Sequence, residues 1–387
     1  MTRRHPGGRR GALAAAALTT ALAALATGCG SAESPDGPER PAQAGKPEAT
    51  DSGAKTSDRA RTPEGTLLVT DFGADTVTFV DPDEGPVDSV KVGTAPYGLA
   101  VGEDGRAWVA TAEGVAVVDT ERRRLLDVVR YETGNLGPAT YGEYRGGGMG
   151  IALAPDGDHV YVGVNVPGDD GTVEAVDTRT LKVTGTAETG RRPFDVDVSR
   201  DGSEVYATGH DGFDVTVVRA ASMEKSRRIE VAPYGTEGGL GSWLKPHYAA
   251  VRPSDGRLLL PFEGERLVVV DPRTGKSRIE RMTANTHQHG ATVTEDGTLL
   301  AVGTGPIDPA TDEGPSLTVR SPDGKEKVIP LDGPHETAEV SEDGRTAYVT
   351  GGFTRDGYWD GITVVDLDSG DTRRLPAGRR PLGIAVL

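Results

Sequence analysis

Histidines are the residues of this sequence best suited to chemistry. The chain has 387 residues and seven histidines, and four of the seven fall between positions 247 and 335. His287 and His289 form a His-x-His pair, whose side chains lie on the same side of an extended strand. Imidazole nitrogens combined with a carboxylate are ligands that zinc prefers. The predicted metal ligands are His247, His287, His289, His335 and Glu336.

The shortage of thiols bears on which metal such a site would hold. The chain has one cysteine, Cys29, near its N-terminus, so the His-rich region offers nitrogen and oxygen ligands. These ligands favour zinc, and copper(II) is the alternative because it also binds imidazole. A structural role is a second explanation, since histidines at strand ends can hydrogen-bond to the backbone without binding an ion.

Several other residues are candidates for contact with a ligand or a protein partner. They are loop aromatics, residues near the predicted channel mouth and a His-Asp pair: Tyr97, Met149, Phe194, His210, Asp211, Trp243, Tyr358 and Trp359. Exposed aromatic side chains would suit a sugar, peptide or protein, whereas packed ones would only close the loops. No nucleophile with an adjacent base and orienting group is recognisable, so a non-enzymatic role is favoured.

The elements that would position these residues repeat along the chain. An apolar strand, a turn containing Asp-Gly and a second strand rich in Val, Leu or Tyr recur every 45 residues or so, roughly the length of a four-stranded propeller blade. The turns are at Asp104-Gly105, Asp156-Gly157, Asp201-Gly202, Asp255-Gly256, Asp296-Gly297 and Asp343-Gly344. Strand candidates come in seven pairs, with hardly any amphipathic helical pattern. We therefore predict an all-β, seven-bladed β-propeller over residues 65–387.

Three segments near the C-terminus carry a family pattern. They are Tyr348-Val349-Thr350, Val364-Val365-Asp366 and Arg380-Pro381-Leu382-Gly383-Ile384-Ala385-Val386. Their order resembles the YVTN family of β-propeller repeats, found in many bacterial surface and periplasmic proteins. The resemblance covers nearly all of the chain after residue 64 and implies the fold without naming a ligand. The last strand has no following partner, so it should pair with the N-terminal strands and close the ring.

Residues can be placed around the propeller axis because, in propellers of this family, the Pro-x-Gly strand lies innermost. Aligning the seven innermost strands puts one residue of each at the same height: Tyr97, Met149, Phe194, His247, His289, Glu336 and Leu382. Three consecutive blades thus offer His247, His289 and Glu336 at the channel mouth. The longest loops fall on the same face, and binding groups concentrate on such loops when a rigid scaffold carries them.

The N-terminal segment predicts export and anchoring. Residues 1–28 combine four arginines with an uncharged Ala/Leu/Thr run too short to span a membrane permanently, which is typical of a signal peptide. Leu25-Ala26-Thr27-Gly28-Cys29 resembles the bacterial lipobox, which implies lipidation of Cys29 and an extracytoplasmic protein anchored to the membrane. Residues 29–64 are rich in Pro, Ala, Ser, Glu and Lys, and we expect a disordered tether.

Charge and the histidine pattern together narrow the function. The net charge of −17 argues against nucleic acid as a partner, and we expect a monomer. Asn285-Thr286-His287-Gln288-His289-Gly290 resembles segments of AztD-type periplasmic zinc chaperones, propellers that pass zinc to the binding protein of an ABC importer. The resemblance implies a metallochaperone for a metal importer. Two alternatives stay open: a non-catalytic envelope scaffold for a peptide, glycan or protein, and a lactonase-like or metal-assisted hydrolase.

Overall fold

The described part of the chain begins at Thr62. The computed structural model describes residues 62–142, 144–231, 245–262, 264–306, 310, 313–352 and 357–387. Cys29, the predicted signal peptide of residues 1–28, residues 29–61 of the predicted tether and Trp243 lie outside the described residues. Within the described ranges, no helix is long and apolar enough to cross a membrane.

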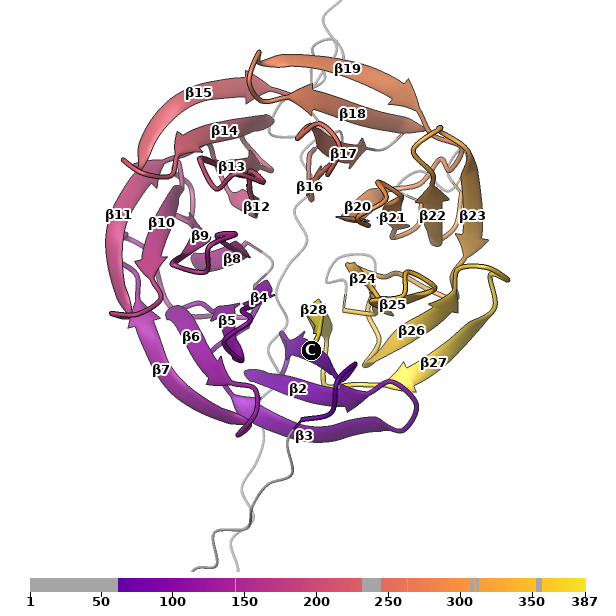
Figure 1. The fold of residues 1–387 in the computed structure, drawn as a ribbon, viewed down its shortest axis with the longest axis horizontal. Helices are drawn as coiled ribbons and strands as arrows, with labels where there is room; N and C mark the ends of the chain where they lie inside the picture. Colours follow the sequence, from indigo (N-terminus) through magenta and orange to yellow (C-terminus); the bar gives the residue numbers. More distant parts are fainter. Residues whose placement is uncertain are drawn as a thin grey trace, which may run out of the picture. The chain divides into compact units, whose positions relative to one another are not determined.

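Four-stranded antiparallel sheets stand around a central axis as the seven blades of a propeller (Figure 1). From the inner to the outer strand, the first three blades are β28 (Pro381–Val386), β1 (Leu67–Asp71), β2 (Thr76–Asp81) and β3 (Gly85–Lys91); β4 (Leu99–Val101), β5 (Arg106–Ala110), β6 (Gly114–Asp119) and β7 (Arg124–Arg130); and β8 (Gly147–Leu153), β9 (His159–Asn165), β10 (Thr172–Asp177) and β11 (Lys182–Glu188).

The other four blades follow in chain order. They are β12 (Pro193–Val198), β13 (Glu204–Gly209), β14 (Asp214–Arg219) and β15 (Glu224–Glu230); β16 (Ala250–Val251), β17 (Leu258–Phe262), β18 (Arg266–Asp271) and β19 (Lys276–Arg281); β20 (Gln288–Val293), β21 (Leu299–Gly303), β22 (Ser316–Arg320) and β23 (Glu326–Pro330); and β24 (Ala338–Val340), β25 (Thr346–Thr350), β26 (Gly361–Asp366) and β27 (Thr372–Pro376).

The ring closes through strand β28. This strand pairs antiparallel with β1, matching Val386 with Leu67 and Ile384 with Val69. The first blade therefore takes its inner strand from the C-terminal end of the propeller and its other three strands from the N-terminal end. The pairing confirms both the predicted seven-bladed fold and the predicted role of the last strand. It also covers a strand edge that would otherwise be open to other chains.

Apolar side chains fill the space between neighbouring blades. The second and third strands of a blade are largely buried, and in β6 every residue is buried. Trp108 of β5, for example, packs in one cluster with Val117 of its own blade and Val162 of the next. Outer strands such as β7 are mostly exposed. This packing explains why the middle strands are continuous apolar runs in the sequence while the outer strands are polar.

The Asp-Gly turns adopt the backbone conformation that their sequence favours. The glycine of each of the six repeat turns has a positive φ, for example 71° at Gly157 and 70° at Gly202. Glycine reaches this region without the steric cost that a Cβ atom imposes. The preceding aspartate closes the turn, as where Oδ1 of Asp156 accepts a 3.0 Å hydrogen bond from the backbone N–H of Asp158. Short turns of this kind connect six of the seven inner strands to their neighbours, and the exception is β28, the last strand of the chain.

Several inner strands bulge where they reach the channel mouth. β8, β12, β20 and β28 each insert an extra residue against the neighbouring strand, around Met149, Phe194, His289 and Leu382 respectively. A β-bulge bends the strand and re-aims the side chain of the inserted residue. The bulges therefore occur at residues that the strand alignment predicted to face the axis.

Glycines allow the bulged strands to approach the next blade closely. A Cβ atom on Gly290, which follows His289, would lie 2.4 Å from the carbonyl oxygen of Glu336 in the next blade. A Cβ on Gly383 would lie 2.6 Å from the carbonyl oxygen of Tyr97. Real Cβ atoms do not approach oxygen so closely, so a side chain at either position would push two blades apart.

Below the mouth, the propeller axis contains a cavity of about 300 Å³ lined by the inner strands. Its charged lining residues are the carboxyls Asp195, Asp197 and Glu339. Burial raises the pKa of Asp195 to about 6. Burial, with the charge of Asp195 in second place, raises the pKa of Asp197 well above its usual value. Ionising these carboxyls inside the channel is therefore costly.

The close approach at Gly290 generates a stability prediction. Gly290→Ala should lower the free energy of unfolding by about 1–3 kcal/mol, because the new Cβ atom meets backbone rather than a movable side chain. Urea unfolding measures the change. Gly134→Ala is the matched control, since a Cβ atom there would have nothing within 4 Å. Equal effects of the two substitutions would contradict the proposed packing constraint.

The channel carboxyls generate a pH prediction. A carboxyl whose pKa is higher in the folded protein than in the unfolded chain stabilises the fold below pH 4, and this contribution is lost as the pH rises through 6. Asp195→Asn should therefore raise the free energy of unfolding by about 1–3 kcal/mol at pH 8 and by much less near pH 4. Denaturation of both proteins at the two pH values tests this. The prediction would be contradicted if the difference in unfolding free energy between parent and variant were the same at both pH values.

Candidate metal centre

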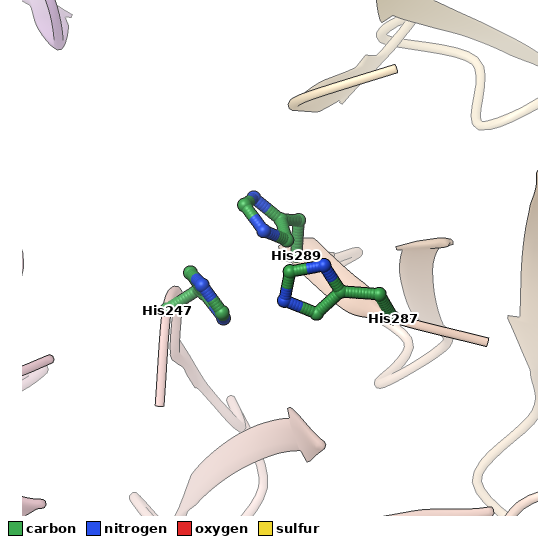
Figure 2. A group of neighbouring side chains, drawn as sticks. All are labelled: His247, His287 and His289. Atoms are coloured by element: carbon green, nitrogen blue, oxygen red, sulfur yellow. The ribbon is translucent and has the colours of Figure 1, made fainter. Parts of the chain in front are cut away.

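Three histidines gather at the channel mouth. His247, His287 and His289 each offer one ring nitrogen, and these three atoms lie within 4.8 Å of one another. The three side chains are at most 3% exposed. Figure 2 shows the rings of His287 and His289 directed towards His247, which comes from the neighbouring blade. The structure thus brings together three of the five predicted ligands through nitrogen atoms that one ion could reach after small side-chain adjustments.

The three rings pack too closely for all of them to be charged. The rings of His247 and His289 stack with centroids 3.8 Å apart. The centroid of the His287 ring lies 4.9 Å from that of His247 and 4.4 Å from that of His289. Like charges at such distances repel strongly where solvent is excluded. The packing favours neutral imidazoles, which are the form that binds metal ions.

Backbone geometry holds the His-x-His pair at the axis. The N–H of His287 donates to the carbonyl oxygen of Gly305 at 3.0 Å, and its own carbonyl accepts from the N–H of Thr304 at 2.8 Å. His289 occupies the bulge of β20 two residues later. Gln288 lies between them, and its Nε2 donates to the carbonyl oxygen of Ala284 at 3.3 Å. Alternation along the extended backbone therefore directs both histidines into the cluster.

Glu336 lies beside the three histidines and contacts one of them. Its Oε1 is 3.3 Å from Nδ1 of His289 and accepts a 3.1 Å hydrogen bond from the hydroxyl of Tyr248. The Glu336 side chain is 2% exposed. A carboxylate at Nδ1 fixes the imidazole tautomer and leaves Nε2 as the metal-binding atom. In this structure Glu336 is placed to orient His289.

His210 reaches the cluster from the preceding blade. It follows β13 directly, and its Nε2 lies 3.2 Å from Nε2 of His247. Its Nδ1 lies 3.0 Å from Oδ1 of Asp211, which also pairs with Lys245 at 2.7 Å and, through Oδ2, with Arg192 at 2.8 Å. Burial lowers the pKa of His210 to about 4, so the ring is neutral near pH 7.

The position of His210 was missed by the alignment of innermost strands, because the residue follows a second strand. From the sequence alone, His210 is predicted as a possible ligand or partner contact and not as a metal ligand. The His-Asp pair at the end of a predicted strand is the signal that could have identified it, since a carboxylate often orients a metal-binding imidazole.

His335 lies apart from this cluster, although it was predicted as a ligand. Its Nδ1 is 2.7 Å from the carbonyl oxygen of Gly333, and its Nε2 is 2.7 Å from the hydroxyl of Thr363. Trp359 packs against the ring with centroids 5.8 Å apart. Burial lowers the pKa of His335 to about 4. Both ring nitrogens thus take part in local hydrogen bonds that hold the fold.

Apolar residues complete the channel mouth next to the histidines. Tyr97, Met149 and Phe194 are at most 5% exposed and pack in one cluster. The Phe194 ring stacks on His210 at 5.3 Å and meets His247 edge-on at 5.5 Å. These three predicted contacts are therefore buried packing residues that shield the histidines, and they do not form an open contact surface.

The two described aromatics of the last long loop differ in exposure. Tyr358 is 45% exposed, and its ring lies under the guanidinium of Arg380 at 4.0 Å. Trp359 is partly buried between His335 and Arg374. Of the two outcomes considered for loop aromatics, exposure applies to Tyr358 and packing to Trp359.

The contacts of His335 generate a prediction that separates it from the cluster. His335→Ala should lower the free energy of unfolding by about 1–3 kcal/mol, because Thr363 loses a buried hydrogen-bond partner. Zinc affinity should not change. Urea unfolding and zinc titration of the same variant measure both quantities. A loss of zinc affinity as large as that of His289→Ala would make His335 a ligand and contradict this assignment.

Comparison with known proteins identifies the architecture alone. No protein-family model matches the chain, and no curated protein sequence matches it. Among solved structures, it is similar to hydrazine synthase from Kuenenia stuttgartiensis, with 18% identity and a TM-score of 0.57 over 74% of this chain and 88% of that one. It is also similar to a functionally unknown protein from Desulfotomaculum acetoxidans DSM 771, with 10% identity and a TM-score of 0.63 over 83% of this chain and 98% of that one. At these identities the likeness supports the β-propeller fold and nothing about activity.

Proposed function

We propose that this protein is an extracytoplasmic, membrane-anchored β-propeller that binds a transition metal, zinc in the first place, at His247, His287 and His289. One observation carries the proposal: three buried ring nitrogens from two neighbouring blades lie within 4.8 Å of one another. Neutral imidazole nitrogens suit zinc, and copper(II) is the second choice.

The packing of imidazole against imidazole in the cluster supports metal binding. Both ring nitrogens of His335 lie 2.7 Å from oxygen atoms, which is the pattern of a histidine that serves the fold. In the cluster, the three rings pack against one another with centroids 3.8–4.9 Å apart, and Nδ1 of His289 lies 3.3 Å from Oε1 of Glu336. Buried polar groups that converge from different strands are costly unless something compensates them, and a bound cation would do so.

The proposed location and role depend on the N-terminal sequence. A lipidated Cys29 would anchor the propeller outside the cytoplasm, and the tether of residues 29–64 would let it reach a neighbouring membrane protein. In that setting the ion is cargo, and the partner is the binding protein of a metal ABC importer. This role follows from the sequence resemblance together with the histidine cluster.

Zinc titration against a chromophoric chelator tests the proposal. The purified protein, in a Cys29→Ser background that removes its one thiol, should bind one zinc ion with a dissociation constant in the micromolar range or tighter. His287→Ala/His289→Ala should weaken binding by at least about 100-fold, because two of three ligands are lost.

The matched control is His159→Ala. His159 begins β9 next to an Asp-Gly turn, and its ring stacks on Tyr161. The substitution therefore removes an imidazole from the protein without changing the histidine cluster. Zinc affinity should then equal that of the parent protein. Absence of zinc and copper(II) binding by the parent protein at equimolar concentration would contradict the proposed function.

A further inference from the structure

We infer that His210 is a fourth protein ligand, so that the metal ion is enclosed by imidazoles from three consecutive blades. The inference rests on the proposed function of His247, His287 and His289 as a metal site. A fourth ligand would give the site a tetrahedral coordination geometry. That geometry in turn determines which class of ion the site selects.

The distance between two ring nitrogens is the first argument. Zinc–nitrogen bonds are about 2.0–2.1 Å long, and the ligand atoms of a tetrahedral ion are separated by about 1.6 times that length, or roughly 3.3 Å. Nε2 of His210 lies 3.2 Å from Nε2 of His247. This one pair therefore has the spacing of two ligands on one tetrahedral ion. His210 stands outside the group of three whose ligand atoms all lie within 4.8 Å of one another, so binding by four imidazoles requires the rings to move closer around the ion.

The contacts of Nδ1 are the second argument, because they decide which ring nitrogen of His210 is available. Asp211 can only accept a hydrogen bond, so its oxygen 3.0 Å away requires a proton on Nδ1. Arg192 Nη1 lies 3.3 Å from the same nitrogen, but its shorter contact is the 2.8 Å ion pair with Asp211. In the neutral ring, Nε2 then carries the lone pair and faces His247.

Packing around His210 is the third argument. The side chain is 3% exposed, and its ring stacks on Phe194 at 5.3 Å with an interplanar angle of 26°. The backbone N–H of His210 donates to the carbonyl oxygen of Arg192 at 2.9 Å. A ligand held by stacking, burial and a second hydrogen-bonding residue is preorganised, so little conformational entropy is lost when it binds an ion.

Glu336 is the competing candidate for the fourth position. Its Oε1 already serves Nδ1 of His289 and the hydroxyl of Tyr248. This arrangement repeats that of Asp211 and His210, a carboxylate on the Nδ1 side of an imidazole. Glu336 and Asp211 are thus positioning residues on opposite sides of the site, and the four ligand atoms are ring nitrogens.

A site with four nitrogen ligands favours ions that accept tetrahedral coordination. Zinc meets this condition, whereas magnesium and manganese prefer oxygen ligands in octahedral geometry. A closed set of four protein ligands also leaves no position for the water that a catalytic zinc site keeps open. The geometry therefore points to an ion that is held or carried, and not to hydrolysis.

Cobalt(II) substitution tests the inference because its visible absorption is strong in tetrahedral sites and weak in octahedral ones. The parent protein with one cobalt(II) should give the strong spectrum. His210→Ala should weaken zinc binding by about 10–100-fold and reduce the cobalt absorption, and added imidazole should restore the spectrum. His210→Asn is the second variant, and thermal unfolding checks that both variants fold.

Two further variants separate ligand from positioning roles. Asp211→Asn and Glu336→Gln should each weaken zinc binding by about tenfold while the cobalt spectrum keeps its tetrahedral intensity. His159→Ala should change neither quantity. If folded His210→Ala and His210→Asn both keep the parent zinc affinity and cobalt spectrum, His210 is not a ligand, while the proposed function survives. If the parent protein binds no metal, the proposed function itself fails.

Discussion

Close approach of the inner strands at the channel mouth is the constraint on which the rest of this structure depends. Where one blade meets the next, glycines such as Gly290 and Gly383 bring backbone within a distance that a side chain would not permit. The bulges of β20 and β28 lie at the same level and direct His289 and Leu382 inwards. Ring closure by β28 holds this geometry, because an open ring would allow the spacing between neighbouring inner strands to increase in every blade.

The mouth that results is divided into an apolar part and a polar part. Phe194 and its apolar neighbours pack as an ordinary core, which excludes water and lowers the local dielectric. His247, His289 and Glu336 are held in the same ring of residues, where burying polar groups is costly. A metal ion would offset that cost, because ion–ligand bonds are strongest where water does not compete. The apolar shielding and the buried polar residues are thus two parts of one arrangement.

Much of this architecture could be predicted from the sequence, and the parts that could not be predicted have physical reasons. The repeat predicted the blades, and the glycine of each Asp-Gly turn has the positive φ that such turns require. Strand alignment also grouped His247 with His289, because equivalent residues of a propeller lie at equal height. It could not predict the orientation of His335, which depends on Thr363 in the third strand of its blade. Nor could it place His210, whose contact with His247 depends on how two blades pack.

X-ray absorption spectroscopy at the zinc edge tests the central claim most directly, because it identifies the atoms around the ion without substitutions. Protein loaded with one zinc ion should show a single shell of nitrogen scatterers at about 2.0–2.1 Å, with the outer-shell features of imidazole rings. A spectrum of oxygen ligands alone, without imidazole features, would contradict the claim that this histidine cluster is a metal site.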